Sequence, residues 1–168
     1  YFSATPESAS IAQGDVVDVA FVPQINEYRG ERSVQMNILD IRPSCAAPCP
    51  MDTFRYRALQ TGQLTPQAAA KLLPDRATLA CVWRYLAAVP GGSLQESPLC
   101  LCRKIVRRSG TELSLEQLLT CLDIFRDVGL LDEKRIHLTV AIRLRTVSGK
   151  ADLTKSETMQ TLLRAKES

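Results

Sequence analysis

Two stretches near the start of the chain alternate between apolar and polar residues. In residues 15–25 and 32–41 every second side chain is apolar: Val17, Val19 and Phe21, then Val34, Met36 and Ile38. A period of two is typical of half-buried β-strands. The polar segment between them contains Gly30, which suits a turn that requires a positive φ. The pattern predicts an antiparallel hairpin with a polar second face: Asp18, Gln24, Asn26, Ser33, Gln35 and Asn37.

The surroundings of this hairpin predict the domain boundaries. A two-stranded hairpin is only marginally stable in water, so residues 1–43 are expected to be part of a larger β domain. Three prolines between residues 43 and 50 then break the strand pattern. We expect a linker with short helices over residues 44–74 and a second domain over residues 75–168.

Helical spacing and capping residues dominate the middle of the chain. Thr65-Pro66 is a helix start, and Asp75 precedes a run with apolar residues at helical intervals that ends before Pro90. Ser97-Pro98 begins a further helix that ends at Gly110. Ser114 and Gln117 form a capping box for another helix, which ends at Gly129. Trp83 is expected to be a core anchor.

The last part of the chain returns to a period of two. Residues 135–145 predict one long strand with an apolar face and a basic face, the latter formed by Arg135, His137, Thr139, Arg143 and Arg145. Thr154 and Glu157 predict the cap of a final helix through Leu163. Three helices followed by β structure is the element order of a winged-helix domain.

Composition is compatible with an ordinary soluble globular protein. The chain has 168 residues, 45% hydrophobic and 23% charged, with a net charge of +3 that permits contact with nucleic acid without requiring it. No apolar run approaches the roughly 18 residues of a membrane span, so no membrane partner is expected. The absence of an initiator Met at Tyr1 favours a piece of a longer protein, and reduced cysteines suit the cytoplasm.

The six cysteines favour buried thiols over a metal site. They occur as a C-x3-C (Cys45 and Cys49), a C-x-C (Cys100 and Cys102) and two single residues, Cys81 and Cys121. None of these spacings is the C-x2-C pair of structural zinc sites, and the last four lie in apolar helical stretches. We expect no cofactor in this chain; a metal on Cys45, Cys49, Cys100 and Cys102 is the alternative.

Two motifs resemble one family. The hairpin carries an Asn-Glu, a turn glycine, a glutamine and an Asp-Ile: Asn26, Glu27, Gly30, Gln35, Asp40 and Ile41. This arrangement resembles the closing strands of the oligonucleotide-binding (OB) domain in RecJ-type exonucleases. The segments LLTCLDIFRDVGLL and KADLTKSETMQTLL resemble the C-terminal domain of RecJ proteins of Gram-positive type. The expected fold class is therefore α+β: part of an OB-type antiparallel β domain, followed by a mainly helical, winged-helix-like domain.

The resemblance implies a role in DNA metabolism without catalysis by this chain. RecJ-type enzymes degrade single-stranded DNA from the 5′ end in recombination and repair, with manganese or magnesium held by Asp and His residues. This sequence has one histidine, His137, so no such metal centre is expected in it. The expected function is to assist single-stranded DNA binding for catalytic domains of the same parent chain. The alternative is docking to a partner such as single-stranded-DNA-binding protein.

The candidate contacts with DNA fall into two groups. A tyrosine flanked by basic and amide residues suits base stacking and phosphate pairing in an OB-type fold: Asn26, Tyr28, Arg29, Arg32 and Gln35. A basic stripe on the 98–109 helix, extended by the 135–145 strand, suits phosphate contacts: Arg103, Lys104, Arg107, Arg143 and Arg145, with Arg108 beside them. The alternatives are a simple turn for the first group and a solvated charged face for the second.

Overall fold

The computed structural model describes two units of the chain, each considered by itself. Described are residues 11, 17–28, 30–43, 53–136, 139–147, 149 and 151–168, with only the backbone of Arg42 and Pro43. Unit 1 is Tyr1–Pro48 and unit 2 is Cys49–Ser168. Helices and small antiparallel sheets occur together, which confirms the predicted α+β class.

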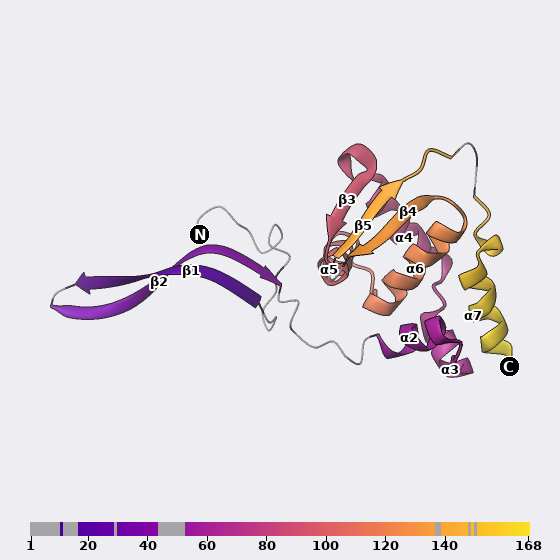
Figure 1. Cartoon of the computed structure of the whole chain (residues 1–168), viewed down its shortest axis with the longest axis horizontal. Coiled ribbons are helices and arrows are strands. Elements are labelled where there is room, and N and C mark those ends of the chain that lie inside the picture. Colours follow the sequence, from indigo (N-terminus) through magenta and orange to yellow (C-terminus); the bar gives the residue numbers. More distant parts are fainter. Residues whose placement is uncertain are drawn as a thin grey trace. The chain divides into compact units, whose positions relative to one another are not determined.

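Unit 1 contains the predicted antiparallel hairpin. Its strands are β1 (Val17–Tyr28) and β2 (Glu31–Pro43), drawn in indigo and purple in Figure 1. Both strands extend further toward the turn than the segments predicted from the apolar alternation. Asn26 and Tyr28 therefore belong to β1. Gly30 lies in the turn with φ 81°, the left-handed conformation that glycine adopts without strain. A bulge next to Ala20 and Phe21 shifts the register and leaves Leu39 as the extra residue on β2.

Unit 2 packs helices against a three-stranded antiparallel sheet (Figure 1). The helices are α2 (Phe54–Thr61), α3 (Pro66–Leu72), α4 (Arg76–Ala87), α5 (Pro98–Ser109), α6 (Leu115–Asp127) and α7 (Glu157–Glu167). The strands are β3 (Ser93–Glu96), β4 (Leu131–Ile136) and β5 (Thr139–Leu144), in the order β3-β5-β4. The short helices expected within residues 44–74 are α2 and α3, and both belong to unit 2.

The predicted helix starts are largely confirmed. Thr65, Asp75, Ser97 and Ser114 each accept a hydrogen bond from a backbone N–H in the first turn of the helix that follows. Ser114 and Gln117 complete the expected capping box. The capping residue predicted for the final helix, Thr154, was wrong, because this helix is capped by Ser156. Thr154 lies instead in a 3₁₀ turn, Leu153–Lys155, that precedes α7.

The predicted long strand over residues 135–145 was wrong. The segment folds back on itself, so that Ile136 pairs with Thr139 and Arg135 pairs with Val140. Residues directly opposite in an antiparallel pair share a face. Arg135 therefore lies on the core side with Val140, and Arg143 lies on the opposite face. The four-residue strand β3 was not predicted, because it is too short to show an alternation.

Two hydrophobic clusters meet at α6. The larger joins α4, α5, α6 and the sheet, with Leu101, Ile105, Leu122, Phe125 and Ile142 among its buried members. The smaller joins α2, α3, α6 and α7 through Tyr56, Ala69, Leu72, Leu119 and Leu162. Leu119 and Leu122 lie on different sides of α6, so the helix contributes to both clusters and is the centre of unit 2.

Truncation of a central α6 side chain tests this core. Leu122 is fully buried, and Leu122→Ala is expected to lower the free energy of unfolding of unit 2 by about 2–5 kcal/mol. Leu163→Ala on α7, where the side chain is 40% exposed, should cost less than about 1 kcal/mol. Urea unfolding followed by the fluorescence of Trp83, the one tryptophan of the chain, measures both. Equal losses for the two variants would contradict the central position of α6.

Candidate nucleic-acid interface

Cross-strand pairing places the amide side chains of the hairpin in one row. Gln24 lies opposite Gln35, Asn26 opposite Ser33, and Tyr28 opposite Glu31 at the end of the row. The Asn37 Nδ2 donates a hydrogen bond of 2.7 Å to the Gln24 Oε1. We call this surface the amide face: Gln24, Asn26, Tyr28, Ser33, Gln35 and Asn37. All six residues are exposed, so their remaining donors and acceptors can reach a ligand.

The amide face brings together three of the five residues predicted on the hairpin. Asn26, Tyr28 and Gln35 lie on it. Arg32 lies on the other face, where its Nε donates to the Glu27 Oε2 at 3.1 Å. Both side chains of this pair are more than half exposed, so the pair contributes little to stability and can exchange with a phosphate. Arg29 lies outside the described residues.

The opposite face of the hairpin is apolar. Phe21 lies opposite Ile38, Pro23 opposite Met36, and Ile25 opposite Val34. Val34 is 76% exposed and Ile25 is 70% exposed. The two faces therefore differ in chemistry. Hydrogen-bonding groups predominate on one, where Val22 opposite Asn37 is an apolar member, and the other carries an apolar stripe that ends at the Glu27–Arg32 pair.

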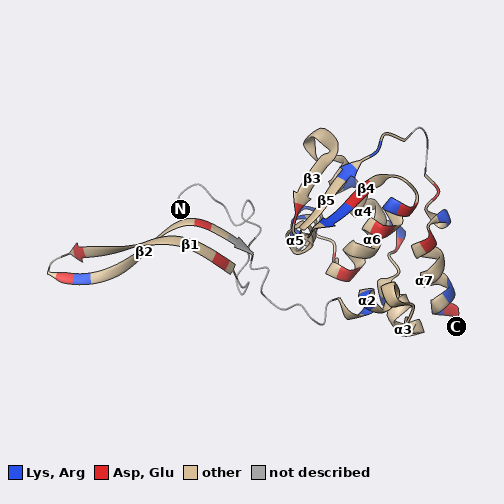
Figure 2. Ribbon diagram, viewed as in Figure 1, with Lys and Arg blue, Asp and Glu red and all other residues tan. Residues whose placement is uncertain are grey.

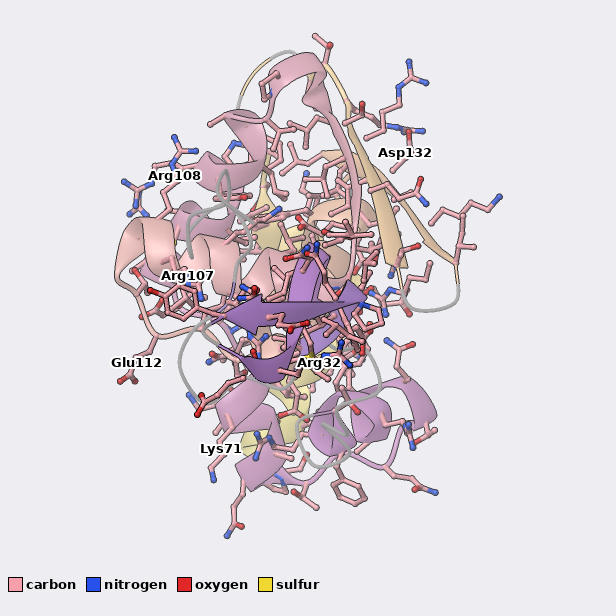
Figure 3. The ribbon with its side chains drawn as sticks, turned by 90° about the vertical axis from the view of Figure 1, so that its left-hand side faces the viewer. Arg32, Lys71, Arg107, Arg108, Glu112 and Asp132 are labelled. Atoms are coloured by element: carbon pink, nitrogen blue, oxygen red, sulfur yellow. The ribbon has the colours of Figure 1, made fainter. Side chains whose placement is uncertain are left out.

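The predicted basic residues of α5 differ in their availability. Lys104 forms a salt bridge with Glu96 of β3, and the two side chains are 34% and 22% exposed, respectively. Burial lowers the pKa of Lys104, but the hydrogen bond and charge of Glu96 outweigh it and raise that pKa. Arg103 is half-buried, whereas Arg107 and Arg108 are exposed on the same flank of unit 2 (Figure 3). The predicted stripe is thus reduced to its last turn.

The basic residues of β5 do not extend that stripe. Arg143 is exposed between Ser93 and Asp132 on the sheet face that points away from the core. Arg145 forms a two-point ion pair with Asp132, with N–O distances of 3.0 Å to both carboxylate oxygens. Basic and acidic positions both occur on the strands, which therefore do not form a field of one sign (Figure 2). The structure therefore separates Arg143 and Arg145 from the basic end of α5.

The first turn of α6 is covered by α2 through a buried carboxylate. Glu116 is 1% exposed. Its Oε1 accepts hydrogen bonds from the backbone N–H groups of Arg55, at 2.8 Å, and Tyr56, at 3.2 Å. The Arg55 guanidinium holds the Oε2 at 2.5–2.6 Å. Since Thr53 makes no side-chain cap, Glu116 serves as the N-terminal cap of α2.

A second buried carboxylate fastens β4 and α2 to the middle of α6. Asp123 is 1% exposed and accepts from the Tyr56 hydroxyl, from Arg126 at 2.8 Å and from Arg135 at 3.0 Å. Arg135 also donates to the Tyr56 hydroxyl at 2.5 Å and to Glu133 at 2.6 Å. Burial, with the charge and hydrogen bond of Asp123, raises the pKa of Tyr56 against the opposing effect of Arg135. Tyr56 therefore remains a neutral phenol that can donate to Asp123.

These contacts leave α6 without a face for DNA. From Leu115 to Phe125 no residue of the helix is exposed. Its C-terminal end holds α7, because the Asp127 Oδ2 accepts from Ser156 Oγ at 2.8 Å and from the backbone N–H of Thr158 at 2.9 Å. A helix that reads the major groove must present several side chains to base edges. The surface of unit 2 that could meet nucleic acid is therefore not α6.

The described cysteines behave as buried thiols. Cys81, Cys102 and Cys121 are buried, and Cys100 is half-buried. No group of three potential metal ligands occurs among the described residues. Burial raises the pKa of the Cys102 thiol to about 11, although Arg103 opposes the shift, and the thiol donates to the Leu113 carbonyl at 3.3 Å. Cys45 and Cys49 lie outside the described residues.

The raised pKa of Cys102 predicts a loss of stability in alkali. Because an unfolded thiol titrates near 8.5, the folded protein is favoured below that pH and loses this contribution as the pH rises to about 11. The change amounts to about 3 kcal/mol in the free energy of unfolding. Cys102→Ala should reduce the fall between pH 8.5 and 11 in urea titrations relative to the wild type. An identical fall in the wild type and the variant would contradict the assignment.

Two residues of α4 join the exposed end of α5, and the sequence patterns did not indicate either. Arg84 and Tyr85 line a pocket of about 370 Å³ together with Arg108. The carbon centre of the Arg108 guanidinium lies 5.8 Å from the centroid of the Tyr85 ring. Their proximity depends on how α4 packs against α5, and a single helix pattern contains no signal for it.

Comparisons with known proteins assign no family to the chain. No family model, no curated protein and no solved structure matches it. Among the described residues no helix combines the length and the apolar character needed to span a bilayer. The functional assignment therefore depends on the surfaces described above and on the two motifs of the sequence.

Proposed function

We propose that this chain is a non-catalytic part of a RecJ-like 5′-to-3′ single-stranded-DNA exonuclease and assists the binding of single-stranded DNA. In this proposal unit 1 supplies closing strands of an OB-type domain. Unit 2 is a winged-helix-like domain that serves as a scaffold. The metal-dependent catalytic domains belong to the same parent chain, and no residue of this chain is assigned a role in catalysis.

The amide face is the observation that carries the proposal. Single-strand-binding proteins stack bases on aromatic side chains and hydrogen-bond the rest of the nucleotide from a β surface. Tyr28 is 67% exposed at one end of the row, and Asn26, Gln24 and Gln35 follow it at every second cross-strand pair, as residues on one face do. The apolar face behind the row suits packing against further strands of a β domain.

The connectivity of unit 2 supports its winged-helix assignment. From α4 to β5 the order is helix, strand, helix, helix, strand, strand, and the first strand pairs with the last. In this frame α6 occupies the place of the recognition helix and β4–β5 the place of the wing. Because α2, α3 and α7 cover α6, the domain would act through its other surfaces rather than by reading duplex DNA.

Removal of the aromatic side chain of the amide face tests the proposal. Tyr28→Ala should weaken the binding of a fluorescein-labelled oligothymidine by at least about fivefold, because one stacked base contributes roughly 1–3 kcal/mol. Fluorescence anisotropy of the whole chain across a salt series provides the measurement. Wild-type affinity should fall as salt rises and should be lower for a duplex of the same length.

Phe54→Ala is a matched control for this experiment. Phe54 is 73% exposed on α2 in unit 2, so it is another exposed aromatic residue outside the amide face. This variant should bind like the wild type. If both variants lose affinity equally, or if the wild-type chain binds no oligonucleotide at low salt, the proposal is wrong.

An apolar groove favours a second candidate function, which is docking of a partner protein. The groove has a volume of about 1090 Å³ and runs between α4 and α7, with Leu79, Trp83, Phe125, Met159 and Leu163 in its lining. Arg76, Arg145 and Asp152 also line it, and Arg145 is paired with Asp132. This combination suits a partner segment with acidic and apolar residues, such as the acidic tail of single-stranded-DNA-binding protein.

Trp83 provides a direct readout for the second candidate. A peptide with the sequence of that acidic tail should change the fluorescence of Trp83 in a saturable way. Leu163→Glu should abolish the change, because it places a negative charge in the groove. Arg164→Gln, next to it on α7 and not among the lining residues, lowers the net charge by the same one unit and is the control. An unchanged Trp83 signal at millimolar peptide would exclude docking in this groove.

A further inference from the structure

The α4–α5 pocket combines positive charge, hydroxyl groups and an aromatic ring over an apolar floor. We use this name for the pocket of about 370 Å³ lined by Cys81, Arg84, Tyr85, Ile105, Arg108, Ser109 and Thr111. Cys81 and Ile105 form its buried apolar part. No lining residue is acidic, so two guanidinium groups share one concavity without a carboxylate among its walls.

The walls of the pocket are held in place by local contacts. Arg84 Nε donates to the Ala80 carbonyl at 3.2 Å, which orients that guanidinium along its own helix. Arg108 lies over the Tyr85 ring. Ser109 Oγ donates to the Ile105 carbonyl at 2.8 Å and accepts from the backbone N–H of Thr111 at 3.1 Å. These contacts organise the pocket in the absence of a ligand.

The turn after α5 brings Thr111 back to the pocket. Gly110 follows the helix with φ 67°, and its N–H donates to the Val106 carbonyl. In this conformation the chain reverses direction directly after Ser109. The pocket wall is therefore continuous from the last turn of α5 into the following segment.

A helix-dipole role alone does not account for this arrangement. Arg84 and Arg108 lie in the last turns of α4 and α5, where a positive charge is favourable to the helix. That role requires each arginine to interact with its own helix and does not require a shared pocket. The nearby acidic residue Glu96 is already paired with Lys104, and Glu112 is exposed in the segment after α5.

We propose that the α4–α5 pocket binds a phosphate group of single-stranded nucleic acid. Arg84 and Arg108 would hold the phosphate oxygens, since the guanidinium fork matches their geometry. Tyr85 offers its ring to the adjoining sugar or base. The volume lies at the lower end of the range for small-molecule sites, which suits one nucleotide unit. This inference rests on the proposed function and adds a contact that is separate from the amide face.

The double substitution Arg84→Gln with Arg108→Gln tests the pocket in the whole chain. Binding of labelled oligothymidine should weaken about fivefold, and the slope of log affinity against log salt should shrink by about 0.7, the value for one phosphate contact on a single strand. Arg57→Gln with Arg164→Gln removes the same charge at two exposed positions outside the pocket and should leave the slope unchanged. Urea unfolding followed by Trp83 fluorescence shows whether each variant remains folded.

The outcomes separate this inference from the proposed function. If Tyr28→Ala weakens binding while the pocket variant behaves like its charge control, the pocket assignment is overturned and the proposed function stands. If the wild-type chain binds no oligonucleotide, the proposed function fails and the pocket is tested with pyrophosphate alone. Saturable thermal stabilisation by pyrophosphate that the double variant loses would support the pocket. Equal or absent stabilisation in the two proteins would overturn it.

Discussion

Burial of two carboxylates on one helix is the constraint on which unit 2 depends. Glu116 and Asp123 are each 1% exposed, and an unpaired charge at such a site would be strongly destabilising. Arg55 and the first N–H groups of α2 satisfy Glu116, whereas Tyr56, Arg126 and Arg135 satisfy Asp123. The requirement is mutual, since α2 obtains its N-terminal cap from α6. The polar contacts therefore fix the position of α2 against α6. The small apolar cluster around Leu72 and Leu119 would by itself define that position less closely.

This constraint decides which surfaces of unit 2 can be functional. The outer side of α6 is acidic and occupied by contacts with α2 and β4, so this helix offers no face to a DNA groove. On the outer face of the sheet, Asp132 balances Arg145. On the side of α5, Glu96 balances Lys104, and what remains is the exposed end of the helix around Arg108. Local pairing thus matters more than the formal charge of +3 in deciding where an anion can bind.

The sequence was informative where structure depends on neighbours along the chain. The hairpin followed from its alternation, because alternation is a local effect. The caps at Thr65 and Ser114 and the helix starts at Asp75 and Ser97 followed from residue type for the same reason. It was misleading across the turn between β4 and β5. The antiparallel pairing of β4 with β5 places Arg135 beside Val140, although a period of two assigns it to the face of Arg143. The partners of Asp123 and the meeting of Arg84 with Arg108 depend on packing between segments far apart in sequence, for which alternation and spacing give no signal.

The function proposed for the hairpin also depends on packing. Its amide face offers donors and acceptors in a row, yet a two-stranded sheet in water does not hold such a row rigidly. Rigidity requires that the apolar face with Ile25, Val34 and Met36 pack against another layer, because those side chains are more than 60% exposed in the hairpin itself. The OB-type context that we propose for unit 1 would supply that layer. Nucleic-acid binding through Tyr28 and its neighbours would then depend on a face that never contacts the ligand, so substitutions on the apolar face would weaken binding by loosening the amide row.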